Sequence, residues 1–303
     1  MNTAVRKTKL LIGWLPLLSG VLMCVSCSVR EQVENCQQYA LTVKAVDVTG
    51  NDLTGTGTVT SVDIYLFSEE RFVRRVPSGT SADFLFAHDK AATLTLVAWG
   101  NLKADSLEVP EIAAGTPIEQ AQLSLRRKES GYNLPITDLF YSRQDVSATP
   151  AKTRGITEES ITLVLERRAA GMSVRTRYFT DQYDKAQGTC HFVIRGTGTA
   201  LNFLGQAVGS GAGYEPVSAT DQQGDTFAAP FRVFPTEASQ QIEIDLYQGE
   251  KLLMSVVNDS QGKPLHAVQG EQMNVEIDFR NAIAQVTVTV EEWGEMNQDT
   301  MFP

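Results

Sequence analysis

Histidine and cysteine, the residues that most often bind metals or carry redox chemistry, are scarce in this sequence. Its 303 residues include three histidines and four cysteines. The histidines, His88, His191 and His266, are far apart and have no companion ligand at the spacing of a metal motif. We therefore predict no metal site and no cofactor.

Common catalytic motifs are also missing. There is no G-x-S-x-G elbow, no H-E-x-x-H helix and no phosphate-binding P-loop. Glu158 is adjacent to Glu159, and Glu291 to Glu292, but adjacent residues on a strand point to opposite faces of a sheet. Neither pair is placed to act on one bond as acid and base. We predict no catalytic residues, and we expect that the protein is not an enzyme.

Positive charge is in the minority. The sequence has 26 lysines and arginines against 36 aspartates and glutamates, which gives a net charge of −10 at pH 7. An acidic surface disfavours binding to nucleic acids and to anionic lipid headgroups. Hydrophobic residues make up 42% of the chain, which is enough for packed cores. We expect a folded protein with no nucleic-acid partner.

A signal peptide is predicted at the N-terminus. Arg6, Lys7 and Lys9 give the chain a positive start, and an apolar stretch follows at residues 10–23. This stretch is shorter than the roughly 20 residues that a membrane-spanning helix needs. A charged start, a short apolar run and small residues after it are typical of a secretory signal peptide, which we place at residues 1–26.

Two cysteines lie at the end of this segment. The stretch Cys24-Val25-Ser26-Cys27 resembles the lipobox of bacterial lipoproteins, with Cys24 where leucine is usual. The alternative, a C-x-x-C redox motif, lacks the surrounding βαβ pattern. We predict cleavage before Cys27 and lipid attachment to Cys27. Several acyl chains on one residue exceed the single chain whose membrane binding is only marginal, so this anchor would be stable.

Cys36 and Cys190 are the remaining cysteines. Their pairing cannot be inferred from sequence. Two separate thiols are the preferred interpretation.

Apolar and polar residues alternate along much of the remaining chain, as in half-buried strands. The alternation is clearest in three sets, which are Leu41, Val43 and Ala45; Val62, Ile64 and Leu66; and Ile242, Ile244 and Leu246. Residues 93–101 are apolar on both faces near their end, as a central strand requires. Residues 115–127 fit either one helix or a short helix and a strand, and no stretch has the pattern of a long amphipathic helix.

These strands predict an all-β fold of two tandem antiparallel β-sandwich domains. A polar stretch with a proline and a glycine separates two apolar regions and is the best candidate for a linker. The predicted segments are the signal peptide 1–26, a lipidated tether 27–38, an N-terminal domain 39–145, a linker 146–158 and a C-terminal domain 159–303.

Trp99 and Trp293 are the two tryptophans that follow the predicted cleavage site. Trp99 lies in the apolar pattern of 93–101, so we expect it in the core, whereas Trp293 closes a strand and fits either a buried or an exposed place. Exposed aromatic rings can stack on sugars. A glycan-binding outer-membrane lipoprotein is therefore the alternative function.

A set of phrases, in this order and at this spacing, carries a family resemblance. The phrases follow Cys27 and Cys36 and are YALTVKAVD (39–47), VDIYLFSEERFVRRV (62–76), TLVAWGN (95–101), DLFYSR (138–143), ITLVLERRAAGMSVRT (161–176), GEQMNVEIDF (270–279) and VTVTVEEW (286–293). The chain resembles the fimbrillin-associated anchor lipoprotein family of Bacteroidales-type fimbriae over essentially its whole mature length.

The resemblance implies a lipid-anchored protein of the outer membrane, exposed at the cell surface and part of a fimbrium. It implies two transthyretin-like domains and a role as fimbrial anchor or accessory subunit. The implied partners are fimbrillin subunits, joined by strand exchange, in which main-chain hydrogen bonds give affinity and alternate side chains give fit. The first strand, residues 39–48, would be retained, because its removal would cut the link to the lipid.

The same resemblance implies an assembly strand within residues 286–303, at the C-terminal end. Its candidate residues are Val286, Val288, Val290 and Trp293. The alternative is that the three valines belong to the last strand of the C-terminal domain, which leaves residues 294–303 as the free segment.

Overall fold

The structure is a computed structural model that describes residues 36–76, 81–87, 92–148, 157–237 and 239–293. These residues form strands and two short 3-10 helices, η2 (Phe179–Asp181) and η3 (Lys185–Gln187), so the all-β prediction is confirmed. Within them, no helix has the length and apolar character to cross a membrane. The predicted signal peptide and Cys27 lie outside the described residues.

A seven-stranded sheet forms the first part of the molecule, in the spatial order β3-β2-β5-β8-β9-β1-β4. Its strands are β1 (Cys36–Val46), β2 (Val62–Ser68), β3 (Arg71–Val76), β4 (Ser81–Ala87), β5 (Ala92–Gly100), β8 (Phe140–Ala148) and β9 (Thr157–Arg167). The prediction of a central strand at 93–101 is confirmed, because β5 lies between β2 and β8.

The two faces of β2 and β5 contribute to different cores. Ile64 and Leu66 pack with Leu41 and Leu163 from β1 and β9 in a core inside the seven-stranded sheet. Successive side chains on a strand point to opposite faces. The ring of Trp99 therefore lies on the other side, where it belongs to a second core shared with the rest of the chain. The sequence predicted that Trp99 is buried, and its side chain is fully buried.

Three further sheets complete the fold. A five-stranded sheet has the order β14-β15-β10-β18-β19, a three-stranded sheet β11-β16-β17 and a four-stranded sheet β13-β12-β7-β6. Their strands are β6 (Leu107–Glu108), β7 (Gln122–Leu125), β10 (Ala170–Arg177), β11 (Cys190–Arg195), β12 (Ala200–Asn202), β13 (Ala207–Val208), β14 (Ser218–Thr220), β15 (Thr226–Val233), β16 (Glu243–Gln248), β17 (Lys251–Val256), β18 (Glu271–Asp278) and β19 (Gln285–Glu292).

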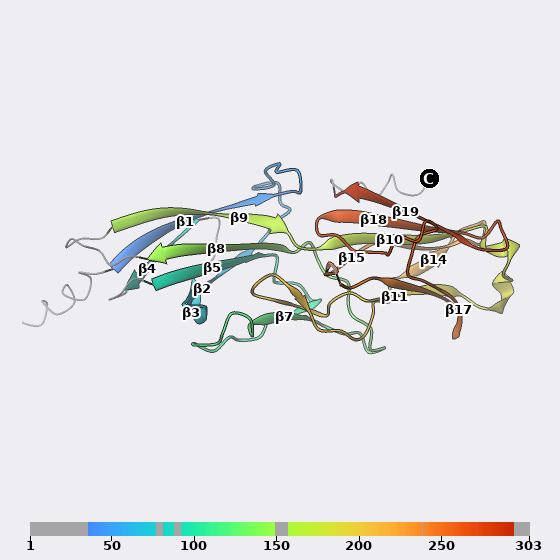
Figure 1. Cartoon of the computed structure of the whole chain (residues 1–303), viewed down its shortest axis with the longest axis horizontal. Coiled ribbons are helices and arrows are strands. Elements are labelled where there is room, and N and C mark those ends of the chain that lie inside the picture. Colours follow the sequence, from blue (N-terminus) through green and yellow to red (C-terminus); the bar gives the residue numbers. More distant parts are fainter. Residues whose placement is uncertain (1–35, 77–80, 88–91, 149–156, 238, 294–303) are drawn as a thin grey trace, which may run out of the picture.

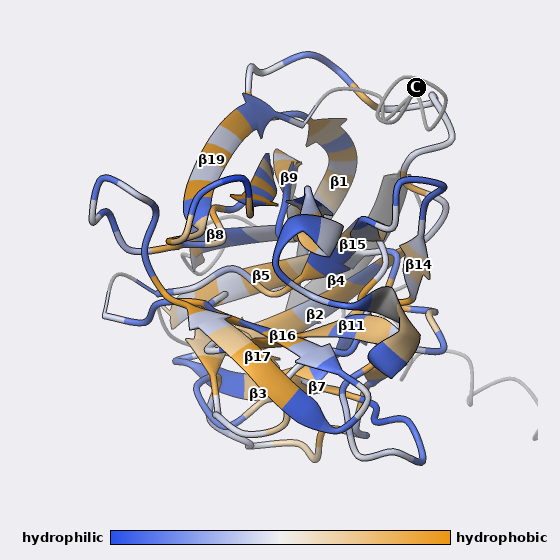
Figure 2. Cartoon of the chain, turned by 90° about the vertical axis from the view of Figure 1, so that its right-hand side faces the viewer, coloured by the Kyte–Doolittle hydropathy of each residue, from blue (hydrophilic) through white to orange (hydrophobic). Residues whose placement is uncertain are grey.

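Figure 1 shows an elongated molecule in which β1 begins at one end, while β10 finishes and β18 turns into β19 at the other. Figure 2 looks onto this second end, where β17 is one of the more hydrophobic strands in view. The three-stranded sheet ends at β17, and Leu252 in that strand is 46% exposed.

The four-stranded sheet joins early and late parts of the chain. Strand β7 pairs with β12, so that Leu123 lies opposite Leu201. Of the two alternatives for residues 115–127, the structure therefore has a strand at Gln122–Leu125, and no α-helix is assigned in 115–127. Phe203, just after β12, packs edge-on against Tyr65 and Trp99. The centroid of its ring lies 4.8 Å from that of Tyr65 and 5.7 Å from that of Trp99.

The prediction of purely antiparallel sheets is wrong at two pairs. Strand β1 runs parallel to β9, and β10 runs parallel to β18. Each pair joins segments about a hundred residues apart or more, and local periodicity carries no information on such pairings. The four-stranded sheet was not foreseen for the same reason.

The predicted linker 146–158 lies between two strands of one sheet. Residues 146–148 end β8, residues 157–158 begin β9, and residues 149–156 lie outside the described residues. The passage from the seven-stranded to the five-stranded sheet is instead at Arg168 and Ala169, between β9 and β10. The limits of two domains stay a prediction.

Candidate functional site

The candidate assembly residues lie on β19, the last strand of the five-stranded sheet. Strand β19 pairs with β18 from Gln285 to Glu292, so the three valines belong to a regular antiparallel ladder. They share one face of the strand, and this face becomes more open along the chain. Val286 is 8% exposed, and Val290 is 48% exposed.

The outer edge of β19 is covered at its start. Val286 donates its N–H to the Ser260 hydroxyl at 2.6 Å and accepts from the Ser260 N–H at 2.9 Å. Backbone groups of successive residues point to opposite sides of a strand. The N–H and C=O groups of Val288 and Val290 therefore point outward as those of Val286 do, away from β18. Within the described part of the chain, the sheet ends at β19.

A cavity of about 300 Å³ lies beside this open part of β19. Its apolar wall comes from Met273 on β18, Leu265, Val288 and Val290, and Val268 on the rim is 45% exposed. An unpaired strand edge beside apolar side chains is the arrangement that accepts an added β-strand.

Trp293 has a different environment from the valines. Trp293 is 3% exposed, and two arginines pack over its ring, with guanidinium carbons 4.7 Å (Arg167) and 4.9 Å (Arg232) from the ring centroid. The Arg167 guanidinium also donates to the Trp293 carbonyl at 3.2 Å and, through two 2.8 Å hydrogen bonds, to Asp138. We call Asp138, Arg167, Arg232 and Trp293 the tryptophan clamp.

The tryptophan clamp binds the end of β19 to the junction between the two large sheets. Arg167 ends β9 and Arg232 lies in β15, so the clamp joins three strands that are far apart in sequence. Burial lowers the pKa of the Arg232 guanidinium. The position of Trp293 excludes it from a sugar-stacking platform, and Trp99 is buried as well. The geometry of these tryptophans therefore gives the glycan-binding alternative no support.

At the other end of the sequence, β1 lies inside the seven-stranded sheet. It pairs with β4 on one side and with β9 on the other. Tyr39, Leu41, Val43 and Ala45 are each at most 4% exposed and fill the core of that sheet. Burial, together with the charge of Glu159, raises the pKa of Tyr39 to about 12. The sheet is therefore complete with the chain's own first strand.

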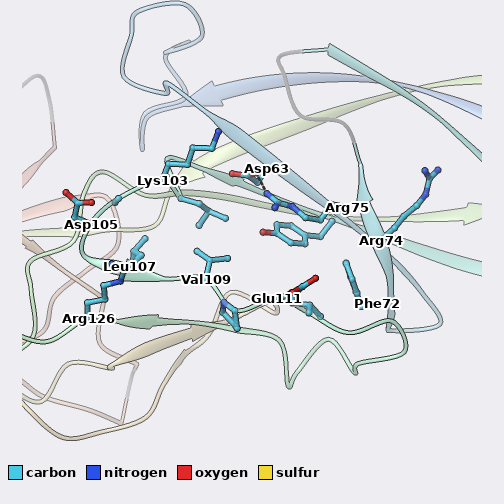
Figure 3. Close-up of a pocket in the computed structure, with 15 residues that line it drawn as sticks. Asp63, Phe72, Arg74, Arg75, Lys103, Asp105, Leu107, Val109, Glu111 and Arg126 are labelled. Atoms are coloured by element: carbon cyan, nitrogen blue, oxygen red, sulfur yellow. Dashed lines mark hydrogen bonds and ion pairs between the residues drawn. The ribbon is translucent and has the colours of Figure 1, made fainter.

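A groove of about 850 Å³ that the sequence did not indicate lies between β3 and residues 102–112 (Figure 3), and both apolar and charged side chains line it. In its lining Arg75 pairs with Asp63, whose side chain is 6% exposed, and the guanidinium carbon of Arg75 lies 5.2 Å from the centroid of the Tyr65 ring. Lys103 and Glu111 also line the groove (Figure 3). Acidic and basic side chains both line it, so it has no single-sign character that would select a charged ligand.

The described residues contain no group of three or more histidine, cysteine, aspartate and glutamate side chains that could hold a metal ion. His191 stacks on Tyr247 with a centroid distance of 5.3 Å and lies 3.8 Å from Glu215. Cys190 is a free thiol, 9% exposed, and burial raises its pKa. A buried thiol with a raised pKa is a poor nucleophile.

Comparison with known proteins gives this arrangement a context. The chain is 26% identical over 284 residues to the major fimbrium anchoring subunit FimB of Porphyromonas gingivalis, an alignment that covers 89% of this chain and 90% of that protein. Its fold resembles the fimbrial anchor protein Mfa2 of Porphyromonas gingivalis, with a TM-score of 0.64 and 13% identity over 85% of this chain and 98% of that one.

The family model described as fimbrillin-A associated anchor proteins Mfa1 and Mfa2 matches residues 32–299. Anchoring a fimbrium is a structural role, and the family is not enzymatic. The chain belongs to this family of fimbrial anchor proteins.

Proposed function

We propose that this protein is the lipid-anchored base subunit of a fimbrium, held in the outer membrane through Cys27. The observation that carries the proposal is the position of β1. Strand β1 is paired on both sides and buried, which supports a chain that keeps its first strand, and that strand begins shortly after Cys27. A subunit that keeps this segment can keep a lipid attached ahead of it.

The partner in this proposal is a fimbrillin subunit, and the contact is made by strand exchange. The outer edge of β19 beyond Val286 supports this mode, because it offers main-chain groups and a neighbouring apolar cavity to an incoming strand. The tryptophan clamp holds the end of β19 to the junction of the two large sheets, so a pull on β19 is carried into the body of the molecule.

The test is Cys27→Ala in the native cell, with this protein and the fimbriae measured in cell and medium fractions. We expect the variant to leave the membrane fraction and the fimbriae to be shed into the medium. A Cys190→Ala variant is the matched control, since that thiol is buried and lies far from Cys27 in the sequence, and it should leave both fractions unchanged.

Two results would contradict the proposal. If the Cys27→Ala protein stays in the membrane fraction, the lipid is not attached at Cys27. If the protein leaves the membrane while the fimbriae stay on the cell, the chain is not their anchor.

A further inference from the structure

Two glutamates face each other at the end of the β18–β19 ladder. Glu271 lies directly opposite Glu292, next to the pair formed by Met273 and Val290. Like charges directly opposite each other destabilise a pair of strands. Among the described residues, no ion pair includes either of these glutamates. The ladder therefore ends in two carboxylates that repel each other and have no basic partner.

Both carboxylates are on the face of the sheet that carries the apolar cavity. Glu271 and Val290 line this cavity. Residues directly opposite each other on paired strands have their side chains on the same face, and the face alternates along each strand. Glu292 is therefore on the cavity face as well, and it is exposed. Asp259 and Lys263, which also line the cavity, have opposite charges and leave the two glutamates without compensation.

The open edge of β19 decides where the side chains of an added strand would lie. The Trp293 N–H donates inward to the Gly270 carbonyl at 3.2 Å, so the main-chain groups of Glu292 and Val290 point outward. A strand on this edge has one residue opposite Val290 and another, two positions away, opposite Glu292. Both side chains would be on the cavity face. The second has its Cβ atom ~5 Å from that of Glu292, which is within reach of an ion pair.

The protein's own segments near this edge cannot supply the matching charge. Strand β19 has the sequence QVTVTVEE, without lysine or arginine, so the β19 of a second copy would add acidic groups only. Residues 294–303, which follow Trp293, also contain no lysine or arginine. The charge that fits this place therefore belongs to another protein.

We propose that the strand bound at the outer edge of β19 carries a lysine or arginine opposite Glu292. This inference rests on the proposed function, in which a fimbrillin strand pairs with this edge. The added cation replaces the repulsion between Glu271 and Glu292 by attraction, and cross-strand pairs of opposite charge stabilise a sheet. Charges at the rim of an interface favour the right partner and suppress wrong ones. The two glutamates thus select a basic partner strand, while the apolar cavity accepts its neighbouring side chain.

The test is Glu292→Lys in the full chain in the native cell. The new lysine faces Glu271, so the unfolding temperature of the detergent-extracted protein should rise by about 1–2 °C. The same lysine repels a basic side chain on the incoming strand. The association should weaken about tenfold, and more fimbriae should be found in the medium. Higher stability together with weaker anchoring excludes misfolding as the cause.

Glu291→Lys is the matched control. It changes the net charge by the same amount, but Glu291 lies opposite Gln272 and has its side chain on the other face of the sheet. This variant should keep the fimbriae on the cell. Glu292→Asp, which preserves the negative charge, should keep them as well.

Salt gives a second readout on outer membranes that carry fimbriae. High salt screens attraction and repulsion alike. A wash in concentrated NaCl should therefore release more fimbriae from wild-type membranes than a wash at low salt. Membranes with Glu292→Lys should show the reverse, with the greater release at low salt. A purely steric effect of the lysine would not reverse the response to salt.

Retention of fimbriae by Glu292→Lys, or the same salt response in this variant and the wild type, overturns the inference. Val290→Pro, which removes an outward N–H, and a strain without the gene separate this result from failure of the proposed function. If these two shed fimbriae while Glu292→Lys retains them, a strand binds the edge without a basic residue at this place. If either of the two retains its fimbriae, the proposed contact or the anchor function itself is wrong, and the inference falls with it.

Discussion

The first and last strands of the molecule, β1 and β19, have similar sequences of alternating apolar residues but different places in the fold. Strand β1 has a partner strand on each side, and its apolar face is buried, with Leu41 2% exposed. Strand β19 is paired with β18 along one side, and Val290 on its apolar face is 48% exposed. The difference indicates that β1 belongs to the core of its sheet, whereas β19 is an edge strand of the described sheets.

Strand β19 is nevertheless fixed firmly at its end. There Trp293 packs against the guanidinium groups of Arg167 and Arg232. An edge that binds a partner under load needs such a fixed end, because otherwise the strand would peel away from β18 before the partner dissociated.

The largest loss of stability is expected from Trp293→Ala, at the end of β19. The variant removes a buried aromatic ring and leaves two arginines without their stacking partner. The free energy of unfolding should therefore fall by ~3–5 kcal/mol. Chemical denaturation of the purified protein measures this free energy. Trp293→Phe keeps an aromatic ring beside the guanidinium groups and should lose less than half as much. Equal losses for the two variants would contradict the role of the clamp.

The second effect concerns the core around β1. Leu41→Ala deletes a side chain that is 2% exposed, which should lower the free energy of unfolding by ~2–4 kcal/mol. Thr42→Ala, at the neighbouring exposed residue, is the control and should change it by less than about 0.5 kcal/mol. Similar values for both residues would show that β1 is not part of the core.

A smaller effect on stability, with a selective effect on assembly, is expected from Val290→Pro. The N–H of Val290 points away from β18, so proline removes no hydrogen bond of the β18–β19 ladder and is tolerated at an edge. Pairing with an incoming strand should be blocked, which counts of cell-attached fimbriae would reveal. Val290→Ala keeps the N–H and should retain the fimbriae. Normal attachment of fimbriae to cells with the proline variant would show that this part of the β19 edge does not bind an incoming strand.

The smallest expected effect is on the pKa of Asp47, in the turn that follows β1. Hydrogen bonds from the Thr49 hydroxyl, and further ones from Asn51, lower the pKa of Asp47 to about 2. A carboxyl whose pKa is lowered by folding stabilises the fold above its unfolded value of about 4, and loses this contribution as the pH falls through about 2. Titration of Asp47 by NMR should give this value, and Thr49→Val should move it back towards 3.8. An unchanged pKa of Asp47 in the variant would show that the threonine hydroxyl is not the cause of the low pKa.

Much of the local structure follows from periodicity. The alternation of Val62, Ile64 and Leu66 predicts β2, and that of Ile242, Ile244 and Leu246 predicts the region of β16. The doubly apolar stretch at 93–101 predicts that β5 is central and that Trp99 is buried, because only a strand covered on both faces can use such a sequence.

The environment of Trp293 could not be predicted in this way. A tryptophan at the end of a strand fits either a buried or an exposed place, and the decision came from Arg167 and Arg232, which are distant in sequence. Tyr178 has a left-handed backbone with a φ of 55°, and this conformation is equally invisible in the sequence.

The sequence by itself therefore determined the all-β class, most of the strands and, through an ordered set of phrases, the family. Alternation and turn residues act over a few positions, so they specify strands but not their neighbours. The tertiary structure alone decided that β1 is enclosed, that β19 is an edge, and that β9 joins β1 to β8 in the first sheet. Each of these depends on pairing between distant segments, which is selected by how the whole chain buries its apolar surface.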